Sequence, residues 1–94
     1  MSTIRVRRGH ALGADRARQA LASFASEMAK FGMKAEWRGN TATLKGTGAS
    51  GDIAVTDDSV VITVKLGLLA KAAGIDATRL ERSIEKRIDA ALAG

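Results

Sequence analysis

Hydrophobic and polar side chains alternate along five segments of the chain, residues 3–8, 33–38, 41–45, 52–56 and 59–66. Alternation with a period of two is typical of β-strands that bury one face and expose the other. The last segment places Val, Ile or Leu at every second position, which is the strongest strand pattern in the chain. We therefore expect it to be a central strand.

Two other segments repeat their hydrophobic residues every three or four positions, the spacing of an amphipathic helix. They span residues 14–31 and 77–93. Gly32 is suited to end the first helix, because glycine readily adopts the left-handed conformation found there. The second helix is expected to begin either with a capping box at residues 78–81 or with Asp76 as the N-cap.

The elements follow one another in the order β-α-β-β-β-β-α, joined by short connections. The Gly39-Asn40 pair is typical of a two-residue hairpin turn, Asp57-Asp58 marks a further turn, and residues 46–51 are expected to form a flexible connection. Polar residues on one face of each strand favour an antiparallel sheet that helices cover on the other face. The sequence thus predicts a single α+β domain over residues 1–94, with both helices on one face of the sheet.

Composition restricts the core and the environment of the protein. Hydrophobic residues make up 46% of the 94 residues, whereas only three residues are aromatic, so the core must be mainly aliphatic. The chain has no cysteine, which excludes disulfides and thiolate metal ligands. It also has no apolar run of the roughly 18 residues that a membrane span requires, and no secretory signal pattern. We expect a cytoplasmic protein.

Catalytic patterns are weak in this sequence. His10 is the single histidine and has no cysteine or second histidine to join it, so we expect it to support the junction between the first strand and the first helix. Residues 46–51 match G-x-G-x-x-G but lead into a strand, whereas dinucleotide binding requires a helix at that point. We therefore expect no enzyme activity, no metal site and no cofactor.

Positive charge is concentrated in the first part of the chain. Residues 1–38 contain eight Lys or Arg and three Asp or Glu, while residues 39–94 contain seven of each. The excess either keeps the protein soluble or marks an anionic partner such as nucleic acid. In the second case the candidate basic patch contains Arg5, Arg7, Arg8 and Arg38.

The segment of residues 66–75 is nearly all apolar although it connects a strand to a helix, where polar residues are usual. Its large apolar side chains are those of Leu66, Leu68, Leu69 and Ile75. They are buried within the monomer, in a homodimer, or against an apolar partner surface.

Several short motifs together give the chain a family resemblance. They are His10 with Leu12-Gly13 before a helix, Trp37 on a hairpin strand, Gly48 and Gly51 before a short strand, and a strand ending in Leu66-Gly67-Leu68-Leu69. In these features the chain resembles the polyhydroxyalkanoic acid system protein family. The resemblance implies a small protein associated with polyhydroxyalkanoate storage, at the granule surface, for which no biochemical activity is established.

Three hypotheses follow. In the first, a non-enzymatic accessory protein of polyhydroxyalkanoate storage binds the granule surface or a granule protein through Leu66, Leu68, Leu69 and Ile75. In the second, the candidate basic patch binds nucleic acid. In the third, a small hydrophobic ligand occupies a cavity between the sheet and the helices.

Overall fold

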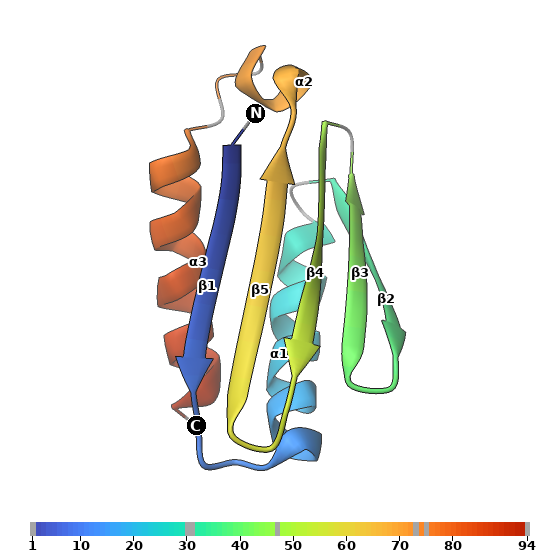
Figure 1. The fold of residues 1–94 in the computed structure, drawn as a ribbon, viewed down its shortest axis with the longest axis vertical. Helices are drawn as coiled ribbons and strands as arrows, with labels where there is room; N and C mark the ends of the chain where they lie inside the picture. Colours follow the sequence, from blue (N-terminus) through green and yellow to red (C-terminus); the bar gives the residue numbers. More distant parts are fainter. Residues whose placement is uncertain (1, 30–31, 47, 73, 75, 94) are drawn as a thin grey trace.

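Two helices cover one face of a five-stranded antiparallel sheet and lie behind it in Figure 1. The computed structural model describes residues 2–29, 32–46, 48–72, 74 and 76–93. The elements are β1 (Ser2–Gly9), α1 (Ala14–Met28), β2 (Met33–Arg38), β3 (Thr41–Gly46), β4 (Ala49–Val55), β5 (Ser59–Leu66), α2 (Leu68–Ala72) and α3 (Ala77–Leu92). The α+β fold class and the predicted β-α-β-β-β-β-α order are confirmed, and α2 is an additional short helix.

The strands are arranged in the order β1-β5-β4-β3-β2. The pairs β2–β3, β3–β4 and β4–β5 are successive antiparallel hairpins, whereas β1 pairs antiparallel with β5, the last strand of the chain. Because β5 has a partner on both sides, its prediction as a central strand is confirmed. The two edges of the sheet are β1 and β2, which lie four strands apart.

Aliphatic side chains fill the space between the sheet and the two long helices. The largest fully buried ones come from both layers and are those of Leu21, Leu44, Ile53, Val60, Ile62, Val64, Ile84 and Ile88. Among the described residues, Phe24 is the aromatic member of this core, and Trp37 packs partly buried at its margin. The expectation of a mainly aliphatic core is therefore confirmed.

Side-chain caps fix where the long helices begin. Asp76 Oδ1 accepts a hydrogen bond of 2.9 Å from the Thr78 backbone N–H, which identifies Asp76 as the N-cap of α3 in preference to the capping box. Asp57 Oδ1 accepts a 3.3 Å bond from the Ala14 N–H at the start of α1. The regular part of α1 ends at Met28, and residues 30 and 31 of the predicted helix lie outside the described residues.

The connection between β3 and β4 is much tighter than expected. The prediction of a flexible connection at residues 46–51 is wrong, because β3 extends to Gly46 and β4 already begins at Ala49. Gly51 is opposite Leu44 on one side and Val64 on the other, as a regular member of the sheet. The side chains at the start of β4 are small, so no apolar alternation is visible there. This part of the strand forms through backbone pairing.

Gly51 provides a test of this pairing. A Cβ atom at position 51 would collide with the Thr63 carbonyl oxygen of β5, so Gly51→Ala must push two paired strands apart. We expect it to lower the free energy of unfolding by about 1–3 kcal/mol in urea denaturation. Gly9→Ala is the matched control: its Cβ would meet its nearest neighbour, the Asp58 carbonyl oxygen, at 3.6 Å, an ordinary contact. Equal stabilities for the two variants would contradict the close approach of β4 and β5.

Candidate functional site

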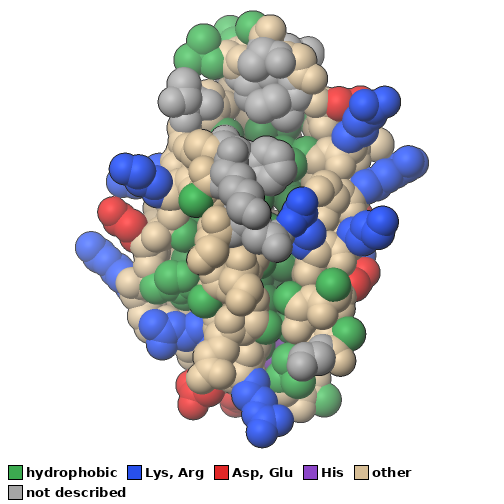
Figure 2. All heavy atoms as spheres, turned by 180° about the vertical axis from the view of Figure 1, so that it is seen from behind, with side chains coloured by type: hydrophobic (Ala, Val, Ile, Leu, Met, Phe, Trp, Pro, Cys, Tyr) green, Lys and Arg blue, Asp and Glu red, His purple; other side chains and the backbone are tan. Residues whose placement is uncertain are grey.

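Two leucines of α2 project from one end of the molecule and are here called the leucine tip. The side chains of Leu68 and Leu69 are 76% and 65% exposed, and they are the large hydrophobic residues left exposed in the described part of the chain. Figure 1 shows α2 beyond the end of β5, and Figure 2 shows hydrophobic atoms gathered at the same end. The leucine tip is therefore a compact apolar projection at one end of the sheet.

The backbone around the leucine tip is anchored to the sheet. Gly67, which joins β5 to α2, donates a 2.8 Å hydrogen bond from its N–H to the Gly48 carbonyl oxygen in the β3–β4 turn. Gly48 has a φ of 77°, a conformation that favours glycine. The short helix thus starts from a defined position at the end of the sheet.

A shallow, mostly apolar hollow of about 690 Å³ adjoins the leucine tip and opens to solvent. It is lined by Gly48, Ala49, Ser50, Lys65, Leu66, Gly67, Leu68 and Leu69. Lys65 and Ser50 bring an ammonium group and a hydroxyl group to its border. The hollow can accept an apolar group and donate hydrogen bonds at one side.

The four predicted apolar contact residues fall into three groups. Leu68 and Leu69 are exposed, as a partner surface requires. Leu66 is only 6% exposed and belongs to the core, so the structure removes it from the candidate contact residues. The reason is its period-two position, which places it on the buried face of β5 with Val64. Ile75 lies outside the described residues.

The residues of the predicted basic patch lie on two different faces of the sheet. Arg5 and Arg7 project from the exposed face of β1, and Arg38 projects from the same face of β2 at the opposite edge. Arg8 follows the opposite phase of the alternation, with Ile4 and Val6, and therefore turns toward the helices. The prediction of Arg8 as a patch residue is wrong.

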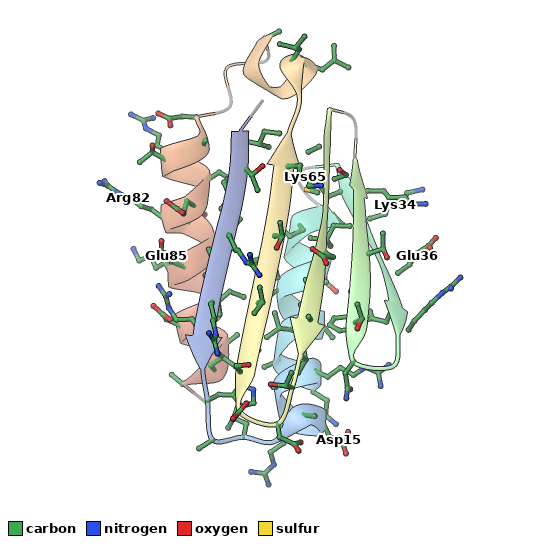
Figure 3. All side chains as sticks on the ribbon, viewed as in Figure 1. Asp15, Lys34, Glu36, Lys65, Arg82 and Glu85 are labelled. Carbon is green, nitrogen blue, oxygen red and sulfur yellow. The ribbon has the colours of Figure 1, made fainter. Side chains whose placement is uncertain are left out.

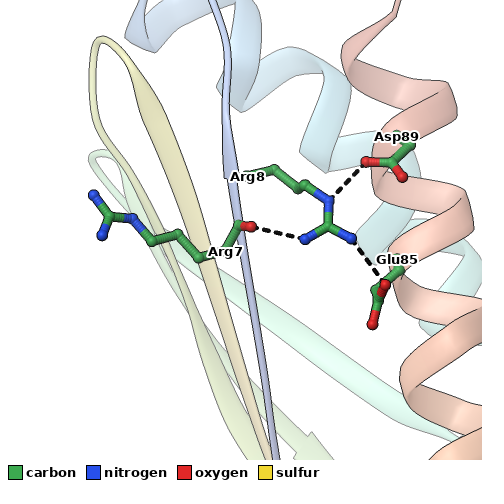
Figure 4. A network of polar contacts seen from close by, with 4 residues as sticks. All are labelled: Arg7, Arg8, Glu85 and Asp89. Carbon is green, nitrogen blue, oxygen red and sulfur yellow. Dashed lines mark hydrogen bonds and ion pairs between the residues drawn. The ribbon is translucent and has the colours of Figure 1, made fainter.

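Arg8 instead fastens β1 to α3 (Figure 4). Its Nε donates to Asp89 Oδ1 at 2.9 Å, its Nη2 to Glu85 Oε2 at 2.8 Å and its Nη1 to the Arg7 carbonyl oxygen at 2.9 Å. The hydrogen bond to Asp89 is the largest cause that raises the pKa of Arg8, with further contributions from the charges of Asp89 and Glu85. Each of the three guanidinium nitrogens thus has a partner within the protein.

His10 has a structural position, as predicted. Its Nδ1 accepts a 3.2 Å hydrogen bond from the Leu12 N–H, which leaves Nε2 to donate to the Thr56 carbonyl oxygen at 3.1 Å. These bonds join the β1–α1 loop to the β4–β5 loop. Within the described residues, no group of three or more His, Asp or Glu side chains is arranged to hold a metal ion.

Strand register brings together three lysines that the candidate basic patch does not contain. Lys34, Lys45 and Lys65 come from three different strands but occupy one row across the exposed sheet face. Alternation gives the face of each lysine, whereas their common row follows only from the register of three strand pairs.

The chain was compared with protein families, with curated proteins and with solved structures. A family model described as "Putative polyhydroxyalkanoic acid system protein (PHA_gran_rgn)" matches residues 4–92. No curated protein and no solved structure matches the chain. Among the helices of the described residues, none is both long enough and apolar enough to cross a bilayer.

The Arg8 contacts lead to a stability prediction. Because the Arg8 side chain is 34% exposed, its ion pairs are screened by solvent, and Arg8→Gln should lower the free energy of unfolding by only about 0.5–1 kcal/mol. The raised pKa keeps this contribution intact at neutral pH, and it is lost in strong alkali as the pH rises through that pKa. Arg5→Gln, which removes an equal charge that forms no ion pair with another described residue, is the control in urea denaturation. A loss that does not shrink at high salt would contradict the electrostatic origin.

Proposed function

Because the chain belongs to the polyhydroxyalkanoic acid system protein family, we propose that it is a non-enzymatic accessory protein of polyhydroxyalkanoate storage. In this proposal the leucine tip binds the surface of the storage granule or an apolar site on a granule protein. The observation that supports it is the exposure of Leu68 and Leu69 on a helix that is fastened to the sheet. The protein would then be located at the granule surface.

The chemistry of the hollow suits a polyester. Such a polymer offers apolar chain segments together with ester carbonyl oxygens, which accept hydrogen bonds. The leucines supply apolar contact, while Lys65 and Ser50 at the border of the hollow supply donors. A single surface feature can thus contact both parts of the polymer.

Energetic arithmetic predicts weak and reversible binding. Complete burial of a leucine side chain contributes about 1.5–3 kcal/mol, so the leucine tip offers about 3–6 kcal/mol at most. A dissociation constant of 1 mM corresponds to about 4 kcal/mol. Many copies on one granule would therefore be needed for dense coverage, and individual molecules would exchange quickly.

A homodimer through the leucine tip is a less suitable arrangement. A stable interface buries about 800 Å² on each partner, far more than two leucine side chains expose. An extended surface such as a granule has no such size requirement, because it can accept a small projection at any point.

Co-sedimentation with purified polyester granules tests the proposal. We expect Leu68→Asn/Leu69→Asn to reduce the bound fraction at least tenfold, because it removes most of the apolar contact without a change in charge. Its fold should be intact, since exposed substitutions usually change stability by no more than about 0.5 kcal/mol. Ala22→Asn/Ser26→Asn, on exposed positions of α1, is the matched control and should sediment like the unmodified protein.

Salt provides a second criterion in the same assay. Apolar adsorption should persist or strengthen as the ionic strength rises. Equal recovery of the tip variant and the control variant would refute a role for the leucine tip. Loss of the wild-type protein from the pellet at high salt would refute apolar adsorption.

A further inference from the structure

The sheet face opposite the helices is uncovered and carries an excess of basic side chains (Figure 3). The row nearest the leucine tip crosses all five strands and contains Thr3, Lys65, Ser50, Lys45 and Lys34. Its lysines are here called the lysine row. The next two rows add Arg5, Arg7 and Arg38, whereas the acidic residues on these rows are Asp52 and Glu36. Six cations thus share the face with two carboxylates.

The lysine row lacks neutralising partners. None of its three ammonium groups forms an ion pair or hydrogen bond with another described residue, in contrast to Arg8 on the opposite face. Lys34 is also directly opposite Lys45 in the β2–β3 pair. Like charges in directly opposite positions destabilise a sheet. A bound anion would therefore relieve the repulsion between Lys34 and Lys45, which no acidic side chain of the described residues neutralises.

The extent of the face matches a polyanion better than a single small anion. Five strands at a spacing of about 4.8 Å give a width of roughly 19 Å. A DNA duplex presents one phosphate charge for about every 1.7 Å of its axis, so several phosphates would meet the face together. The hydroxyl groups of Thr3 and Ser50, in the same row, are additional donors of the kind that contact phosphate oxygens.

The face offers no means to read bases. Of the aromatic residues that the structure describes, Phe24 is in the core, and Trp37 faces the helix side with the Arg18 guanidinium 5.7 Å from its ring centroid. Proteins that bind single strands usually stack bases on exposed aromatic rings. Contact through phosphates alone therefore favours a duplex bound without regard to sequence.

We propose that the open sheet face binds the phosphate backbone of double-stranded DNA without sequence preference, and that the lysine row is its principal contact. The site adjoins the leucine tip, because Lys65 and Ser50 also border the hollow beside it, but the proposal does not depend on granule binding. The proposed DNA-binding face differs from the basic patch expected from the sequence. Arg8 is not part of it, because it pairs with α3 on the other side of the sheet, and the three lysines are added.

Fluorescence anisotropy with a short mixed-sequence duplex, measured between about 50 and 200 mM NaCl, tests this proposal. Lys34→Gln/Lys45→Gln/Lys65→Gln should weaken binding at least tenfold. It should also reduce the slope of log K against log salt concentration by about 2.7, which corresponds to the loss of three phosphate contacts. Arg79→Gln/Arg82→Gln/Lys86→Gln changes the net charge equally at exposed positions of α3 and should bind almost like the wild type.

Lys45→Glu separates binding from folding. It places a carboxylate opposite Lys34, so the melting temperature should rise by about 1–5 °C while affinity for DNA falls. A variant that merely unfolded would melt earlier. Leu68→Asn/Leu69→Asn should retain its affinity for DNA even if it no longer sediments with granules.

Three outcomes would overturn the proposal. The first is no binding of duplex DNA by the wild-type protein at about 50 mM NaCl. The second is an equal loss in the two triple variants, which would show a response to net charge alone. The third is binding to anionic phosphatidylglycerol vesicles with no binding to DNA, which would identify a lipid surface as the partner.

Discussion

Burial on only one side of the sheet is the constraint on which the whole structure depends. The chain contains two long amphipathic helices, and both pack on the same face. Every strand must therefore send apolar side chains to that face, or the core would be incomplete. The opposite face is left to water, so charged residues can accumulate there without a cost in core packing.

The pairing of β1 with β5 completes this arrangement. It brings the first strand beside the last one and aligns their exposed residues with those of the three intervening hairpins. Arg8 then joins the edge strand to α3 across the margin of the core. The open face and the leucine tip consequently adjoin each other, with Lys65 and Ser50 at their common border.

Alternation and helical spacing were sufficient to predict the fold, because both report which side chains face the core. They failed at Gly51, which belongs to a strand that has no apolar pattern at that point. Alternation does place Arg8 on the face of Ile4 and Val6, so its inclusion in the basic patch went against that pattern. The leucine tip was predicted only in part. An apolar segment of the sequence indicates both Leu66 and Leu68 as contact residues, but it does not distinguish the buried side chain from the exposed one. The lysine row requires the register of paired strands, which depends on the backbone hydrogen bonds of the whole sheet.

The position of α2 at one end of an elongated molecule has a consequence for orientation. The molecule measures 38 × 23 × 20 Å, and α3 runs from the end near α2 toward the opposite end (Figure 1). A molecule held by Leu68 and Leu69 would stand upright, with its strands roughly perpendicular to the supporting surface and the last turn of α3 near the end that points away from it (Figure 1). A domain fused after α3 would therefore be displayed toward the solvent, and the chain would serve as a rigid spacer between a granule and its cargo.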